Sequence, residues 1–303
     1  MNRVLVTGAS GFLGRPALAA LGASGYEIHA AVRHVPQRKS DGVSWHAVDL
    51  LDAEARRDLL HRSRPTHLLH LAWFVEHGTF WTAAENGAWR SASLDLAREF
   101  ARQGGRRAVM VGSCAEYDWS RRDAKPWAES DPLRPATPYG KAKHELLQAL
   151  AREAPNLGLS YAWARLFLMF GDGENEKRLV PSLIEGLLAG REVALGTGER
   201  VRDFMDVKDI AAAIAALLVR ETVTGAVNVA SGAGVTIAEL AERIADLADA
   251  PRSLLRFNAL PPRDEPPAMV ADVRRLRDEV KFVPRFSLEQ RLKEQVARRR
   301  VRR

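Results

Sequence analysis

The sequence contains only one cysteine, Cys114. A single thiol excludes an intramolecular disulfide framework and any zinc site built from clustered cysteines. Long hydrophobic runs are also missing, because the longest, residues 210–219, has ten residues, whereas a membrane-spanning helix needs roughly 20. The first residues lack the apolar segment and small-residue cleavage site of a signal peptide. We therefore expect a soluble, cytoplasmic protein with no membrane partner.

Metal ligands are equally sparse. His70 and His77 are possible ligands, but no third ligand at a suitable spacing accompanies them. A histidine within a strand is more often a packed side chain, so we expect no bound metal.

Acidic residues are outnumbered, since 38 Asp and Glu face 45 Lys and Arg, which gives a net charge of +7 and a pI near 9.8. A basic balance can indicate a polyanionic partner. Five arginines stand among the last six residues, however, and without them the count is 40 against 38. We interpret residues 298–303 as a basic tail and expect no nucleic-acid partner. Nucleic-acid binding through this tail would require a salt-dependent affinity that is lost on truncation after Ala297.

Short apolar strands alternate with amphipathic helices through the first half of the chain. Strands are expected at 4–6, 28–32, 67–72, 108–111 and 161–166, and helices at 15–23, 51–63, 82–103 and 139–153. This alternation predicts βαβ units and an α/β fold with a doubly wound parallel sheet. After residue 167 the pattern loosens into helices at 180–189, 207–219 and 236–248 and a strand at 227–229. We expect one domain over 1–166 plus about 201–230, and a smaller C-terminal α/β lobe over 167–200 and 231–297.

A glycine-rich loop follows the first strand and opens the first helix. Glycine at such a turn lets the backbone approach a pyrophosphate, and the helix N-terminus offers N–H groups and partial positive charge. We predict a dinucleotide cofactor here, a plain tight turn being the alternative. The residues assigned to its contact are Gly8, Ser10, Gly11, Phe12, Leu13 and Gly14.

The end of the second predicted strand bears on the choice of cofactor. An acidic residue there would bind the ribose 2′-hydroxyl of NAD, whereas an arginine accommodates the 2′-phosphate of NADP. No acid occurs between Ala31 and Asp41, and Arg33 stands at the strand end. We therefore favour NADP(H), with Arg33 stacking on adenine and pairing with phosphate, and keep NAD(H) as the alternative. Asp49 and Leu50 are assigned to the adenine edge.

Tyr139 and Lys143 are four residues apart in a predicted helix, so they share one face. A neighbouring ammonium favours the phenolate and lowers the pKa of a phenol from about 10. A group tuned toward the working pH is a better proton donor or acceptor. The pair is therefore a candidate catalytic site, although such a spacing is also common on protein surfaces.

In combination, these motifs resemble the extended short-chain dehydrogenase/reductases, and more narrowly their sugar-nucleotide epimerase/dehydratase/reductase group. The residues that carry the resemblance are the glycine loop, His70-Leu71-Ala72, Ser113, Tyr139, Lys143 and Arg202-Asp203-Phe204. The resemblance implies a Rossmann-type domain that binds NAD(P) and a C-terminal lobe that binds a nucleoside-diphosphate sugar. It also implies a triad of Ser113, Tyr139 and Lys143 acting on a sugar hydroxyl or ketone, with Tyr139 and Lys143 also touching the cofactor.

The same resemblance assigns further contacts. Leu71 and Ala72 are placed beside the cofactor, and Trp73, Asn86, Arg202 and Arg263 beside the substrate, the two arginines facing its diphosphate. Family members are often dimers through two helices, here about 85–103 and 139–153, so we expect a homodimer.

The subgroups of this family differ at the active-site strand end. The 4,6-dehydratases carry Thr-Asp-Glu where this chain has Ser113-Cys114-Ala115, so dehydration is not expected. Many 4-epimerases carry an Asn where this chain has Leu168. We therefore expect an NADPH-dependent ketoreductase of a 4-keto-6-deoxy sugar nucleotide. The alternatives are an NAD-dependent nucleotide-sugar 4-epimerase without net redox and a non-catalytic NADP-sensing protein.

Overall fold

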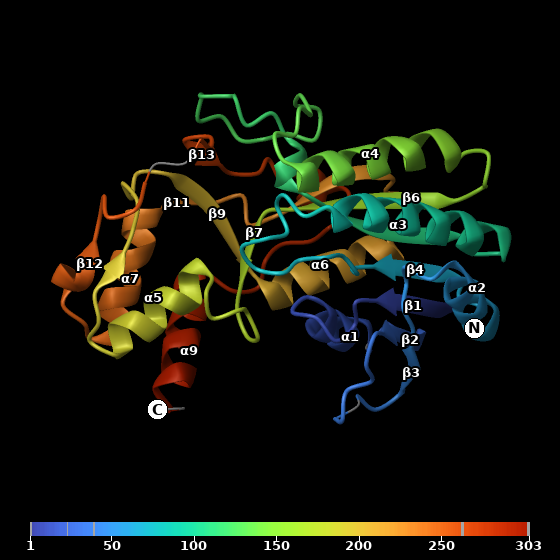
Figure 1. The fold of residues 1–303 in the computed structure, drawn as a ribbon, viewed down its shortest axis with the longest axis horizontal. Coiled ribbons are helices and arrows are strands. Elements are labelled where there is room, and N and C mark those ends of the chain that lie inside the picture. Colours follow the sequence, from blue (N-terminus) through green and yellow to red (C-terminus); the bar gives the residue numbers. More distant parts are fainter. Residues whose placement is uncertain (1, 23, 39, 262–263, 302–303) are drawn as a thin grey trace.

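A computed structural model describes residues 2–22, 24–38, 40–261 and 264–301 and shows two α/β bodies side by side (Figure 1). The larger body is built on a seven-stranded parallel sheet with the order β10-β6-β5-β4-β1-β2-β3. Its strands are β1 (Arg3–Thr7), β2 (Glu27–Val32), β3 (Val43–Ala47), β4 (His67–His70), β5 (Arg107–Ser113), β6 (Ser160–Leu166) and β10 (Gly225–Val229). Strand order reverses beside β1, which confirms the predicted doubly wound sheet.

Helices cover both faces of this sheet. Adjacent strand residues point to opposite faces, so Val4 and Val6 join one core and Leu5 joins the other. The first core includes α1 (Gly14–Gly22) and α6 (Val207–Val219), and the second includes α2 (Ala53–Ser63), α3 (Glu85–Arg102) and α4 (Pro138–Glu153).

The smaller body has its own mixed sheet. Its central strand β9 (Val201–Asp206) pairs with β7 (Leu168–Phe170), β11 (Gly234–Thr236) and β13 (Ala268–Met269), and β8 (Val193–Ala194) pairs separately with β12 (Leu255–Arg256). Helices α5 (Leu179–Leu188), α7 (Ile237–Ala248) and α9 (Leu288–Val301) enclose a separate apolar core. Thr236 and Glu239 form the reciprocal cap that begins α7.

The boundaries between the two bodies differ from the sequence expectation. Strand β9 lies in the smaller sheet, so the returning segment of the larger body starts with α6 rather than near residue 201. The buried carboxylate of Asp203 explains this, because it accepts hydrogen bonds from Ser231, Gly232 and Ala271 of the lobe. The short helix α8 (Arg274–Asp278) also packs against β10, so residues near 274–282 return to the larger body.

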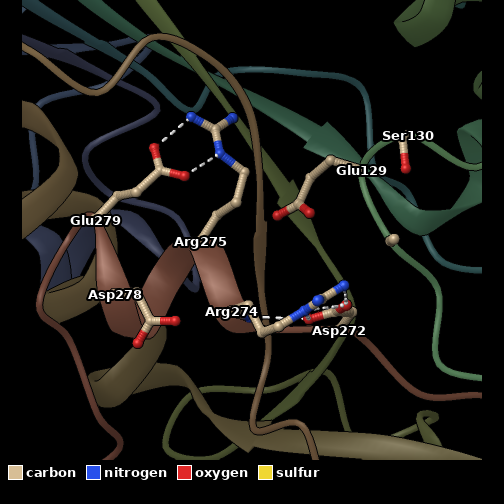
Figure 2. Close-up of a pocket in the computed structure, with 8 residues that line it drawn as sticks. Glu129, Ser130, Asp272, Arg274, Arg275, Asp278 and Glu279 are labelled. Carbon is tan, nitrogen blue, oxygen red and sulfur yellow. Dashed lines mark hydrogen bonds and ion pairs between the residues drawn. The ribbon is translucent and has the colours of Figure 1, made fainter.

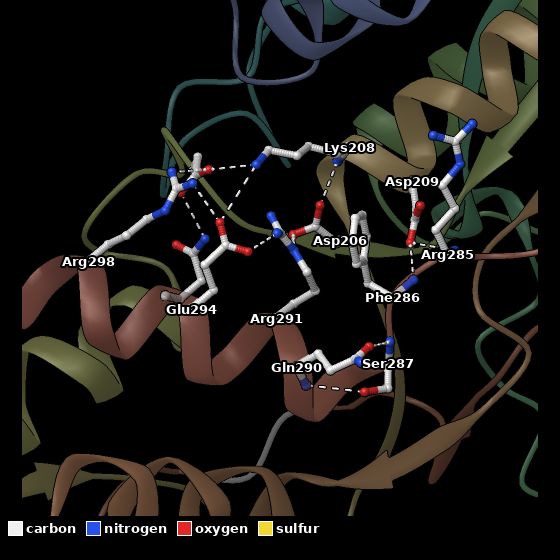
Figure 3. Close-up of polar contacts among 12 residues, drawn as sticks. Asp206, Lys208, Asp209, Arg285, Phe286, Ser287, Gln290, Arg291, Glu294 and Arg298 are labelled. Atoms are coloured by element: carbon white, nitrogen blue, oxygen red, sulfur yellow. Dashed lines mark hydrogen bonds and ion pairs between the residues drawn. The ribbon is translucent and has the colours of Figure 1, made fainter.

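The predicted basic tail differs as well, because residues up to Val301 belong to α9. Arg298 pairs with Asp172 and Glu294, and Arg299 and Arg300 pair with Glu185 and Asp249. Figure 3 shows α9 turning its polar side chains toward the junction of β9 and α6, where Arg291 binds the buried carboxylate of Asp206. Acidic groups of the lobe therefore balance much of the arginine charge. Within the described residues, no helix combines the length and apolarity needed to cross a membrane.

Candidate active site

The three predicted catalytic residues come together at the carboxyl edge of the large sheet. Ser113 ends β5, while Tyr139 and Lys143 lie in the first turns of α4, which packs on that strand. Thr137 caps the helix by accepting from the N–H of Gly140, and Pro138 occupies the first turn, where no amide donor is needed. Loops at this edge of a doubly wound sheet are where ligands bind.

Tyr139 lies in an aromatic cage and is only 9% exposed. Phe80, Trp81 and Trp73 approach its ring edge-on, with centroid separations of 5.1, 5.6 and 6.4 Å. Burial raises the pKa of the Tyr139 phenol above its usual 10; hydrogen bonding to Ser113 opposes this effect, and the negative charge of Glu116 reinforces it. Like an ordinary tyrosine, the phenol is protonated at neutral pH, as a proton donor requires.

Lys143 is buried, and its ammonium lies closer to Trp73 than to Tyr139, its expected partner. Its Nζ donates to the carbonyl of Val111 at 2.8 Å and lies 3.6 Å from the centroid of the Trp73 ring, compared with 6.0 Å from that of Tyr139. Burial lowers the pKa of Lys143 to about 7. The net pKa of the Tyr139 phenol is raised, with burial as the largest cause. The expectation that the Lys143 ammonium lowers this pKa stays a prediction.

The turn after Ser113 contains a buried acid, Glu116, that was not among the predicted site residues. Ser113 begins a 3₁₀ turn over Cys114–Glu116, and the fully buried Glu116 carboxylate accepts from the Ser113 N–H at 2.7 Å. Glu116 also accepts from the indole of Trp163 and the guanidinium of Arg165, both on β6. The pattern Ser-x-x-Glu directly after a strand is a capping-box signal that could have identified this acid.

The glycine loop has the shape of a cofactor cradle. Gly8 has φ +68°, and a Cβ there would lie 2.9 Å from the backbone nitrogen of Ala72. A Cβ on Gly14 would lie 2.2 Å from the carbonyl oxygen of Gly8, although Gly14 itself starts α1. Both glycines are therefore required by close backbone approaches. A loop this tightly packed at a helix N-terminus fits the pyrophosphate of a dinucleotide.

The other predicted cofactor residues line the same edge. Leu71 and Ala72 follow β4, and their N–H groups both donate to the hydroxyl of Thr7 at 3.2 Å. Arg33 and Asp49 are exposed after β2 and β3, whereas Leu50 is buried. Within the described ranges Arg33 makes no hydrogen bond or ion pair, so its guanidinium is available to an anion.

Trp73 and Asn86 form one buried unit next to the triad. The Trp73 indole N–H donates to Asn86 Oδ1 at 2.9 Å, and the Asn86 amide donates to the carbonyls of Phe80 and Ala83. Asn86 is 2% exposed, so it holds Trp73 and the Phe80 segment around the tyrosine. Its assignment to the substrate stays a prediction.

Arg202 lies near Cys114, next to the end of β5, but its guanidinium already has protein partners. It is on β9, and its guanidinium binds Glu265 at 2.8 Å and the carbonyls of Val201 and Pro266. Burial raises the pKa of the Cys114 thiol to about 12, and the charge of Arg202 acts in the opposite direction. Arg263 lies outside the described residues, so both diphosphate assignments stay predictions.

A depression elsewhere in the larger body has a different character (Figure 2). It lies between α8 and the loop at residues 128–130, and no predicted site residue lines it. Its arginines are paired, Arg275 with Glu279 and Arg274 with Asp272. The predicted catalytic triad and glycine loop lie at the carboxyl edge of the sheet, outside this depression.

Comparison with known proteins fixes the family. The family model described as NAD dependent epimerase/dehydratase family matches residues 4–230. The chain belongs to this family. The match spans the glycine loop, the triad strand and α4, and it confirms the predicted resemblance to the extended short-chain dehydrogenase/reductases and the NAD(P)-dependent type of enzyme.

Individual relatives agree with this membership. A UDP-glucose 4-epimerase of Rhizobium meliloti is 28% identical over 277 residues, which covers 82% of this chain and 83% of the relative. A dTDP-6-deoxy-L-talose 4-dehydrogenase (NAD(P)(+)) of Kitasatospora kifunensis is 26% identical and covers 96% and 94%. The crystal structure of a UDP-glucose 4-epimerase from Thermotoga maritima superposes with a TM-score of 0.87 at 23% identity over 100% of this chain and 99% of that one, which supports the fold.

Proposed function

We propose that this protein is an NADPH-dependent ketoreductase that converts a 4-keto-6-deoxy sugar nucleotide to the 4-hydroxy product. The observation that carries the proposal is the position of Tyr139, whose buried phenol lies beside Ser113 at the carboxyl edge of the large sheet. Ketone reduction consumes a proton at the carbonyl oxygen, so the resting enzyme needs an acid at this position.

The residues present fit a nicotinamide dinucleotide. The backbone cradle at Gly8 and Gly14 would hold its pyrophosphate, and Lys143 would hold its ribose. Arg33, exposed and without a partner in the described part of the chain, would bind a 2′-phosphate, which favours NADPH over NADH. When bound, the reduced nicotinamide supplies the hydride.

The protein side chains then handle the carbonyl oxygen. Ser113 donates a hydrogen bond to it and orients it, and Tyr139 transfers its proton to the oxygen as the carbonyl carbon is reduced. The phenolate left on Tyr139 regains a proton from solvent after the product leaves. The aromatic cage around Tyr139 keeps bulk water from competing for the proton.

Two observations support the choice of a 4-keto-6-deoxy sugar nucleotide. The acid pair that the resemblance associates with dehydration is replaced by Cys114 and Ala115. The Kitasatospora relative, which matches nearly the whole chain, is a 4-dehydrogenase of a 6-deoxy sugar nucleotide. We also propose a homodimer through α3 and α4, which size-exclusion chromatography with light scattering can test.

The test is an NADPH-oxidation assay across a panel of 4-keto-6-deoxy sugar nucleotides, with NADH alongside. We expect turnover with NADPH, and we expect Tyr139→Phe to lose roughly 100-fold or more of kcat, the scale of general acid catalysis. Tightly held NAD in the purified protein, with interconversion of 4-epimers and no net oxidation, would support the epimerase instead. Undiminished turnover by Tyr139→Phe would overturn the assigned acid.

A further inference from the structure

The 3₁₀ turn over Cys114–Glu116 lies next to all three proposed catalytic residues in the chain or in space. Ser113 is its cap, and the Val111 carbonyl that binds Lys143 lies two residues earlier on the same strand end. On the other side the turn meets α4 at Gly140, where a Cβ would lie 2.3 Å from the carbonyl oxygen of Ala115. Gly140 directly follows Tyr139, so the position of this turn sets how closely the tyrosine approaches Ser113.

One carboxylate holds this turn in place. Glu116 Oε1 accepts from the Ser113 N–H at 2.7 Å, and Glu116 Oε2 accepts from Arg165 Nε at 3.1 Å. The Trp163 indole N–H donates to the same carboxylate at 3.0 Å. Glu116 and Arg165 are completely buried, so their pairing replaces the solvation that both charges lose.

The local sequence is adapted to this arrangement. A Cβ at Gly112 would lie 2.0 Å from Trp163 Nε1 and 2.4 Å from Glu116 Oε1, so only glycine leaves room for the carboxylate beneath the strand end. Arg165 faces Gly112 in the parallel register of β5 and β6. The Ser113 N–H is therefore supported by residues on β5, the 3₁₀ turn and β6. These residues are Gly112, Glu116, Trp163 and Arg165.

We propose that Glu116 is a positioning residue of the active site, whose carboxylate fixes the Ser113 backbone so that Ser113, Tyr139 and Lys143 keep their mutual geometry. It acts through the Ser113 N–H and does not touch substrate or cofactor. The proposal rests on the proposed function for the roles of the triad, but its structural readout needs no substrate.

The experiment compares two double variants that both lack the buried ion pair. Glu116→Gln with Arg165→Met keeps an oxygen acceptor for the Ser113 N–H, whereas Glu116→Ala with Arg165→Met removes it. Removing both charges together avoids an unpaired buried charge in either protein. Glu129→Gln is the matched control, because Glu129 also accepts from a strand amide, that of Asn228 at 2.8 Å, away from the triad.

We expect the Gln variant to keep kcat within about threefold of wild type. The Ala variant should lose roughly 100-fold in kcat, which is the scale of an approximately 1 Å misplacement. The KM for NADPH should change little in either variant. Hydrogen exchange at the Ser113 amide, followed by NMR without substrate, should be slow in wild type, the Gln variant and the control, and fast in the Ala variant. Equal kcat in the two double variants, or a Ser113 amide that stays protected in the Ala variant, would overturn the positioning role. If wild type reduces no keto sugar while the exchange pattern is as expected, the proposed function fails and the positioning of Ser113 stands.

Discussion

Three glycine-to-alanine substitutions can separate the effect of backbone strain from that of steric overlap in the glycine loop. Two are in the loop, at Gly8 and Gly14, and the third, at Gly25, is a comparison outside it. Gly8 combines a positive φ of +68° with a close approach to Ala72, whereas Gly25, in the connection from α1 to β2, has φ +72° and open space. Gly14 shows the overlap alone, since its Cβ would lie 2.2 Å from the Gly8 oxygen at an ordinary φ. The positive φ costs an L residue roughly 1–2 kcal/mol. A contact at 2.2 Å instead of a normal one near 3.5 Å requires the loop to move by about 1 Å.

These magnitudes predict different outcomes for the three variants. Gly25→Ala should lower the free energy of unfolding by about 1–2 kcal/mol and leave the Kd for NADPH unchanged. Gly14→Ala should displace N–H groups from the pyrophosphate, and each lost charge-assisted hydrogen bond, at about 1.5–3 kcal/mol, weakens NADPH roughly 10- to 150-fold. Gly8→Ala should show both effects.

The assays are urea unfolding for stability and NADPH fluorescence titration for affinity. If Gly14→Ala binds NADPH with the wild-type Kd, or if Gly25→Ala weakens binding as much as Gly14→Ala does, the close-approach explanation of the loop is refuted.

The remaining predictions concern three charged side chains. Arg33→Ala should raise the Kd for NADPH about 10-fold or more and leave NADH unchanged, with Arg38→Ala as the control in the same titrations. The pKa of Lys143 is about 7 in the folded state and 10.5 unfolded, so the unfolded chain binds more protons between these values and stability should rise with pH across that window. Lys143→Met should remove this rise and lose activity. Near pH 6 its free energy of unfolding, measured by urea titration, should exceed that of wild type by up to about 5 kcal/mol. Asp172→Asn should lower stability by about 1 kcal/mol through the lost ion pairs with Arg298 and Lys208, and this difference should shrink in roughly 1 M salt.

Sequence patterns were sufficient where a feature depends on local periodicity. The helix expected at 207–219 has those bounds, and β1, β2, β4, β5 and β6 carry apolar runs that are recognisable without neighbours. Strand β3 was not predicted, because its residues Val43–Ala47 include Ser44 and His46 and form no apolar run. Strand β9 was not predicted, because its buried Arg202 and Asp203 interrupt the apolar pattern and their hydrogen-bond partners lie far along the chain. Helix α9 was not predicted, because its many arginines mask the apolar spacing. Leu288, Leu292 and Val296 are four residues apart and pack on the lobe.

The candidate site divides in the same way. Glycine spacing and the Tyr139–Lys143 interval are local, so the sequence indicates them directly. The direction of the Lys143 ammonium depends on Trp73, which arrives from another loop and is held there by Asn86. The burial that raises the tyrosine pKa is likewise a property of the assembled cage, and no pair of residues read from the sequence predicts its sign.

The chain passes between the two bodies after β6, between β9 and α6, after β10, after β13 and between α8 and α9. A separate apolar cluster with Trp127, Tyr117, Phe167 and Met269 fills this junction, and the Trp127 indole donates to the Ala268 carbonyl. The lobe is therefore not a module that can be cut out at one point. Transplanting a different substrate specificity from a relative would require several separate segments to be exchanged together with the residues that pack around Trp127. Unfolding should accordingly proceed as a single cooperative transition rather than lobe by lobe.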